Sequence, residues 1–159
     1  MPKKWKLTKK KFEEIYNLLK EKLGERVIFS QGDETKFLEL KDSNFWLSMN
    51  KDELTVGFGL NHSHFSEDYN NLENGIIRVF DLLTNQIKTT LHIKGDYIYK
   101  EITEIIYSNG ETVNIGKSSI LFYPFWKKKK IITKYSDVII EKNKIELEFN
   151  RHYPTKCVS

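Results

Sequence analysis

The sequence is poor in cysteine and has no long hydrophobic run. Its 159 residues include one cysteine, Cys157, which excludes an internal disulfide framework and a thiolate-rich zinc site. The basic N-terminal stretch is not followed by the roughly 7 to 15 apolar residues of a secretory signal. No window reaches the roughly 18 apolar residues that cross a bilayer. We therefore expect a cytoplasmic protein with no membrane partner.

The familiar catalytic motifs are also missing. The chain has no Gly-x-Ser-x-Gly elbow, no phosphate-binding loop ending in Gly-Lys-Ser/Thr, no Gly-x-Gly-x-x-Gly fingerprint and no His-Glu-x-x-His pair. Cys157 is the third residue from the end printed here, a poor position for an oriented nucleophile. These absences predict a protein that is not an enzyme, with no catalytic residues, no cofactor and no metal.

What the sequence does contain is apolar mass and unevenly distributed charge. Hydrophobic residues make up 39% and charged residues 30%, which fits one folded domain over residues 1–159. The net charge is +4, but residues 27–116 carry seven basic and fourteen acidic side chains between two basic ends. An acidic middle argues against a protein that simply coats nucleic acid.

Hydrophobic periodicity predicts two main helices and a set of short strands. Residues 8–23 and 72–86 carry apolar side chains at helical spacing, with Thr8 as the expected N-cap of the first helix. Residues elsewhere alternate between apolar and polar, as strands do. The predicted strands are 27–30, 36–41, 44–49, 53–60, 88–94, 96–107, 112–115, 119–123, 130–135, 138–140 and 145–149. We predict a single α+β domain with a largely antiparallel sheet.

The densest cluster of chemically versatile side chains follows the strand 53–60. His62 and His64 lie two residues apart in what we expect to be a surface turn, and Gly57 and Gly59 leave one strand face bare for a close-lying backbone. We predict a protein-binding surface here. Its expected residues are Asn61, His62, His64, Glu67 and Asp68.

Two other interpretations of the histidine pair remain open. Imidazoles at i and i+2 on an extended chain project to one side and could share a metal ion, which would suit a metal-dependent hydrolase. The sequence supplies no obvious third ligand, however, and negative charge at Glu67 and Asp68 also suits the start of a helix. The sequence favours instead a pair that is packed or hydrogen-bonded within a loop.

A second candidate segment joins aromatic side chains to a lysine run. Phe122-Tyr123-Pro124-Phe125-Trp126 precedes Lys127, Lys128, Lys129 and Lys130. Rings that stack on bases beside charges that neutralise phosphates are typical of single-stranded nucleic-acid binding. Lysines at a sheet edge also prevent strands of different molecules from pairing. Nucleic-acid binding through Trp126 and Lys127–Lys130 is therefore our alternative to protein binding.

One stretch resembles a known group of proteins. The segment 54–65, the helix ending in Phe80-Asp81-Leu82-Leu83-Thr84-Asn85 and the strand from Ile87 together resemble bacterial immunity proteins of polymorphic toxin systems. Gly59, His62, His64 and Phe65 carry the resemblance, which covers about residues 54–94. It implies a cytoplasmic protein that binds and blocks a cognate toxin without catalysis or cofactor. We expect the protein itself to be monomeric or weakly dimeric. The acidic middle would suit a basic nuclease toxin.

Overall fold

The structure, a computed structural model, describes residues 3–152. It confirms the α+β fold, with three α-helices and two antiparallel sheets in the described residues. The helices are α1 (Lys3–Leu23), α2 (Leu72–Thr84) and α3 (Lys142–His152), and a short 3-10 turn, η1 (Gly24–Arg26), follows α1. Cys157 lies outside the described residues.

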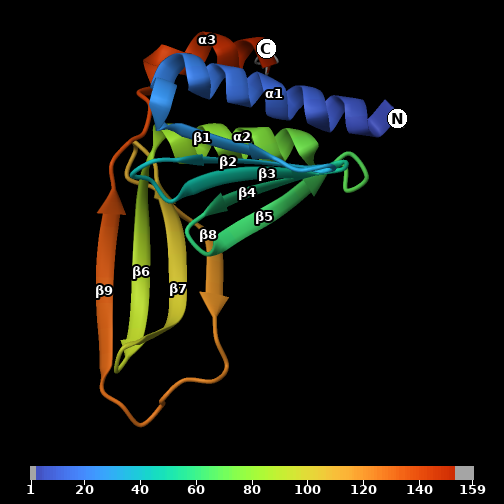
Figure 1. The fold of residues 1–159 in the computed structure, drawn as a ribbon. Helices are drawn as coiled ribbons and strands as arrows, with labels where there is room; N and C mark the ends of the chain where they lie inside the picture. The colour runs from blue at the N-terminus through green and yellow to red at the C-terminus, as the bar shows by residue number, and fades with distance from the viewer. Residues whose placement is uncertain (1–2, 153–159) are drawn as a thin grey trace.

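The first sheet is a five-stranded meander. Its strands are β1 (Val27–Gln31), β2 (Thr35–Leu40), β3 (Phe45–Asn50), β4 (Glu53–Phe58) and β5 (Asn61–Ser66), in that spatial order. Helices α1 and α2 lie over one face, and α3 lies beyond them (Figure 1). We call this part, residues 3–84 with α3, the head.

The second sheet extends away from the helices as a projecting arm (Figure 1). Its strands are β6 (Gln86–Lys94), β7 (Tyr97–Ile106), β8 (Thr112–Ser119) and β9 (Lys129–Ser136), in the order β8-β7-β6-β9. The loop 120–128 joins β8 to β9 at the far end of the arm. We call residues 86–136 the arm, and residues 92–101 and 117–132 its distal end.

The hydrophobic core lies between the first sheet and the helices. Leu38, Leu47 and Val56 oppose one another across three strands and are buried beneath Leu19 of α1 and Val79 of α2. The base of the arm completes this core through its own buried apolar residues, Ile87 and Ile105. The base is thus where the arm shares the hydrophobic core of the head.

Both predicted helices exist, with corrected ends. Helix α1 begins at Lys3, and Thr8 is not its N-cap but a buried residue whose hydroxyl donates to the Asp52 carbonyl at 2.8 Å. Helix α2 ends at Thr84 rather than residue 86 because the Asn85 backbone turns to an extended conformation.

The sequence interpretation of the C-terminal region was wrong. Residues 145–149 belong to helix α3, and residues 138–140 form no strand. Ile-Glu-Leu-Glu-Phe alternates as a strand would, but Ile145 is buried while Leu147 is 79% exposed. That difference is expected from helical geometry, in which residues two apart point in different directions. The predicted strand 119–123 is also absent, because β8 runs unbroken over 112–119 and a loop follows.

Candidate binding surfaces

The face of the first sheet that points away from the helices carries a row of rings. Phe37 stacks on Trp46 with centroids 6.0 Å apart, Trp46 lies 5.6 Å from His62, and His62 meets His64 edge-on at 5.2 Å. Strand pairing places these side chains on one side of β2, β3 and β5. We call this surface the open face. Its members used below are Ile28, Phe37, Glu39, Trp46, Glu53, Thr55, His62 and His64.

The side chain of Trp46 explains why strand β4 has a glycine at position 57. A Cβ on Gly57 would overlap the Trp46 indole, whose Nε1 donates to the Gly59 carbonyl at 3.0 Å. The glycine therefore admits a neighbouring side chain, not a close-lying backbone as the sequence suggested. Gly59 has φ +61° and, with Leu60, forms the two-residue turn between β4 and β5.

The histidines lie on a strand rather than in the turn that the sequence suggested. Residues 61–66 form β5, which pairs with β4 so that His62 opposes Gly57 and His64 opposes Thr55. Both imidazoles are exposed. As alternate residues of a strand they point to the same side, as the i, i+2 spacing predicted.

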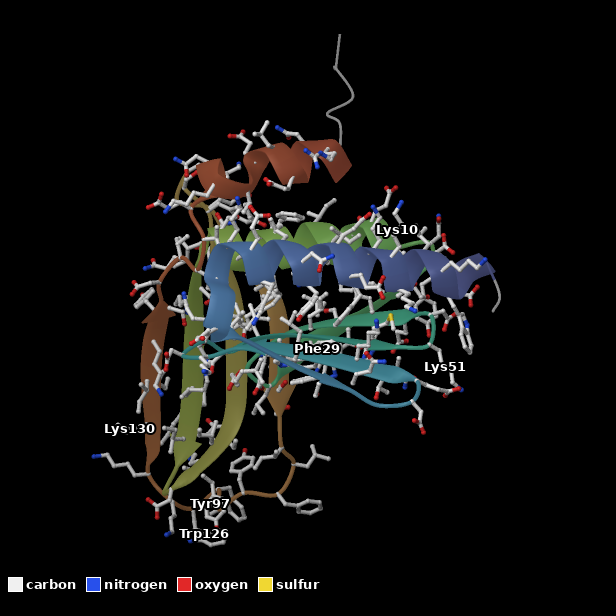
Figure 2. The ribbon with its side chains drawn as sticks, turned by 45° about the horizontal axis from the view of Figure 1, so that its top comes forward. Lys10, Phe29, Lys51, Tyr97, Trp126 and Lys130 are labelled. Atoms are coloured by element: carbon white, nitrogen blue, oxygen red, sulfur yellow. The ribbon has the colours of Figure 1, made fainter. Side chains whose placement is uncertain are left out.

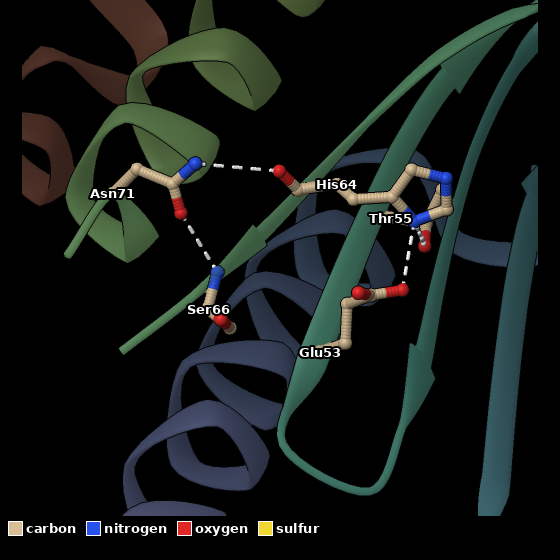
Figure 3. Close-up of polar contacts among 5 residues, drawn as sticks. All are labelled: Glu53, Thr55, His64, Ser66 and Asn71. Carbon is tan, nitrogen blue, oxygen red and sulfur yellow. Dashed lines mark hydrogen bonds and ion pairs between the residues drawn. The ribbon is translucent and has the colours of Figure 1, made fainter. Parts of the chain in front are cut away.

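A carboxylate missed by sequence reasoning orients His64. Glu53 Oε1 lies 2.7 Å from His64 Nδ1, and Thr55 Oγ1 lies 3.1 Å from the same nitrogen (Figure 3). Asn71 holds the strand end by accepting from the Ser66 amide at 2.8 Å and donating to the His64 carbonyl at 3.4 Å. A β4–β5 hairpin read from the sequence would have placed Thr55 beside His64.

This arrangement ties one nitrogen of each imidazole to the protein. His62 Nδ1 lies 3.3 Å from the Leu60 carbonyl, so both rings present Nε2 outward when Nδ1 carries the proton. Within residues 3–152, no group of three or more His, Cys, Asp or Glu lies close enough to hold a metal ion. The hydrolase hypothesis therefore finds no third ligand in that part of the chain.

The sequence placed Asn61 in the binding surface, but the structure buries its side chain in the junction between head and arm. It is only 5% exposed, its amide donates to the Thr103 hydroxyl at 2.7 Å, and it accepts from the Ser118 hydroxyl at 2.6 Å. These bonds join β5 of the head to β7 and β8 of the arm. Burial in this junction removes Asn61 from contact with a partner.

Glu67 and Asp68 lie beyond the end of β5, in the turn that leads to α2. The Asn70 amide donates to the Glu67 carbonyl at 2.9 Å, which closes this turn. The carboxylate that contacts a histidine is Glu53, from the neighbouring strand. The two acidic residues named from the sequence therefore belong to the turn and not to the open face.

The four consecutive lysines after Trp126 do not form one site. Lys127 lies against Gly95, and Lys128 remains in the loop. Lys129 opposes Lys94 while Lys130 opposes Ile93, so these last two point to opposite faces of the arm. Figure 2 shows Trp126 and Lys130 at the far end of the arm from the helices.

Lys129 instead joins lysines from two other strands around His92. Burial first, and then the charges of Lys100, Lys129 and Lys117, lower the pKa of His92 below its usual value. Burial and the charge of Lys117 likewise lower the pKa of Lys100. The one strand carboxylate on this face is Glu104, which pairs with Lys88 at 3.1 Å nearer the head. We call Lys100, Lys117 and Lys129 the arm lysine cluster.

A third polar site lies between α2, α3 and the base of the arm. Asp81 and Tyr107 line a pocket of about 410 Å³, and the Tyr107 hydroxyl donates to Asp81 Oδ2 at 3.0 Å. Burial raises the pKa of Asp81, and burial together with the Asp81 charge raises the pKa of Tyr107 to about 12. The bond fastens the arm to the head.

No protein-family model matches this chain, and neither a curated protein nor a solved structure matches it. The resemblance to immunity proteins therefore stays a prediction. Among residues 3–152, the helices are all too short or too polar to traverse a lipid bilayer.

Proposed function

We propose that this is a non-catalytic protein-binding protein that docks its partner on the open face, and that its role is to neutralise a cognate bacterial toxin. The supporting observation is a sheet face that the described helices leave uncovered and that carries a continuous row of rings from Phe37 to His64. Ile28 and Phe37 are about 40% and 36% exposed there. Apolar and aromatic surface of this kind is typical of interfaces.

The charge on the open face favours a basic partner. Its strands contribute two carboxylates, Glu39 and Glu53, and strand register places no lysine or arginine on this side of β1–β5. Lys36, the one basic residue in these strands, points toward α1, where it pairs with Glu13 at 2.8 Å. Complementary charge accelerates association, so a basic nuclease toxin remains the partner that we propose.

The test is co-expression with the product of the neighbouring gene. We expect a stable complex and relief of toxicity, and we expect Glu39→Lys to slow association because it reverses a charge on the open face. Glu146→Lys is the matched control, since Glu146 is exposed on α3. Without its partner, the protein should sediment as a monomer or a weak dimer.

Absence of both complex and rescue would remove this proposal. An equal loss of association in Glu39→Lys and Glu146→Lys would place the interface elsewhere. The metal-dependent alternative is addressed by elemental analysis of the purified protein, because stoichiometric zinc, manganese or nickel lost in His62→Ala would favour it.

A further inference from the structure

The arm lysine cluster is a concentration of like charge without compensation. Three lysines surround His92 of β6, namely Lys100 of β7, Lys117 of β8 and Lys129 of β9. The charges of all three contribute to lowering the pKa of His92. None of the ion pairs in the described residues joins these three lysines to a carboxylate. Such repulsion works against folding, so a bound anion is the natural means of relieving it.

The wider distal end has the same charge. Residues 92–101 and 117–132 contain seven lysines and two acidic residues, a net charge of +5. One of the acidic residues, Glu101, is buried and accepts from the Leu60 amide at 3.2 Å, which directs it toward the head. The lysine face of the arm is therefore strongly electropositive, and strand alternation places it on the opposite side from Glu101.

Aromatic rings accompany the lysines. Tyr99 stacks on Tyr123 with centroids 4.4 Å apart, and His92 meets Tyr99 at 6.0 Å. At the tip, Phe122 and Trp126 are 93% and 73% exposed. Rings held in water next to lysines supply the two components that single-stranded nucleic acids need, namely stacking surfaces for bases and charges for phosphates.

We propose that the distal end of the arm binds single-stranded nucleic acid, with Lys100, Lys117 and Lys129 on the phosphates and Trp126 stacking on a base. The lysine cluster extends from β9 to β8 across four strands, about 14 Å at the usual strand spacing. At one phosphate per about 3.4 Å of stacked strand, this span covers roughly four phosphates.

An anionic membrane surface is the other polyanion to consider, and the placement of the charges disfavours it. A membrane-inserting loop carries its lysines around the apolar tip, as Lys127 and Lys128 are here, but the arm lysine cluster continues onto the strands behind it. The chain Tyr123–Tyr99–His92 continues the ring surface along the same strands. This layout suits a ligand laid along the sheet.

The experiment measures fluorescence anisotropy of a labelled oligothymidylate against protein concentration at several potassium chloride concentrations. The parent protein should bind with a strong salt dependence. Replacing all three cluster lysines by alanine should weaken binding about tenfold or more, and should reduce the slope of log affinity against log salt by about two, since each phosphate contact contributes about 0.7. Trp126→Ala should weaken binding about fivefold or more through lost stacking.

The matched control replaces Lys10, Lys20 and Lys51, which are exposed lysines of the head, by alanine. It removes the same charge and should leave most of the affinity and slope unchanged (Figure 2 shows Lys10 and Lys51 far from Trp126). Circular dichroism confirms that each variant is folded.

Three outcomes would overturn this proposal. The first is an absence of salt-dependent binding by the parent, and the second is a loss of affinity in the head variant as large as in the arm variant. The third is binding of phosphatidylserine vesicles without binding of the oligonucleotide, which would assign the arm to membranes. None of these outcomes bears on the open face, so the two proposals stand or fall separately.

Discussion

The head and the arm are both built on antiparallel strands, but they differ in how far the side chains of those strands are buried. In the head, each strand of the meander sends one set of side chains into a core that α1 and α2 close. In the arm, only the base shares that core, and the distal end leaves both rings and lysines in water. Burial therefore accounts for the side of the head sheet that faces the helices, whereas the distal arm, like the open face, carries residues that burial does not explain. Such residues indicate a surface kept for binding.

Paired phenylalanine truncations should give the largest difference between the two regions. Phe58 of β4 is 2% exposed and Phe122 of the arm tip is 93% exposed. Phe58→Ala should lower the free energy of unfolding by about 3–5 kcal/mol because it leaves a cavity. Phe122→Ala should change it by less than about 0.5 kcal/mol. Urea unfolding measures both, and a comparable loss in Phe122→Ala would mean that the tip is packed.

The junction between the regions should give the next largest effect. Asn61→Ala should lower the free energy of unfolding by about 2 kcal/mol, because it leaves the buried Thr103 hydroxyl and the Ser118 hydroxyl without their partner. Amide hydrogen exchange in β7 and β8 should accelerate more than exchange in β3. Asn143→Ala, at an exposed position in α3, is the control. Uniform acceleration across both sheets would show that head and arm open as one unit.

The hydrogen bond from the Tyr107 hydroxyl to Asp81 is the second link between head and arm, and it should be sensitive to alkaline pH. The folded state raises the pKa of Tyr107 from 10.0 to about 12, so the protonated phenol stabilises the fold below pH 10. This contribution is lost as the pH rises from about 10 to 12. Tyr107→Phe should cost about 1 kcal/mol at pH 7 after solvent screening is allowed for, and the gap from the parent should narrow above pH 10.

Thermal unfolding of both proteins between pH 7 and 11 measures that gap. Tyr97→Phe provides the control, since Tyr97 is exposed at the distal end of the arm. If the gap between parent and Tyr107→Phe stayed constant across this range, the phenol would not be coupled to Asp81 in the way that the 3.0 Å bond indicates.

Much of the fold could be predicted from local patterns, because local physics decides it. The apolar stripe of α2 and the Asn109-Gly110 turn between β7 and β8 are determined by residues close in sequence. Strand β5 was missed because its polar residues read as a turn, although the Gly59-Leu60 turn before it forms a two-residue hairpin. Helix α3 was missed because a short alternating run fits both the two-residue period of a strand and the 3.6-residue period of a helix.

The candidate sites were harder to predict because they depend on register between distant strands. Glu53 reaches His64 only through β4–β5 pairing, and Lys100, Lys117 and Lys129 meet His92 only once three strand pairs are aligned. The lysine run after Trp126 lies in the region of the proposed arm site. Alternation along β9 then places Lys129 and Lys130 on opposite faces of the arm, which cannot be seen from their adjacency in the sequence.

The smallest expected effect is a change in the pKa of one residue of the arm, His92. Burial and the arm lysine cluster together hold the pKa of His92 below its usual value. In an NMR titration, His92 should titrate at lower pH than a model histidine, and Lys100→Ala should move its pKa upward because one repelling charge is gone.

An added anion should act in the same direction as that substitution. Inorganic tripolyphosphate bound at the cluster would raise the pKa of His92, because negative charge favours the imidazolium. It should leave the amide resonances of β5 unchanged, since that strand lies in the head. Comparable changes in β5 and at His92 would reflect general ionic screening, and the distal arm would then have no charge environment different from that of the head.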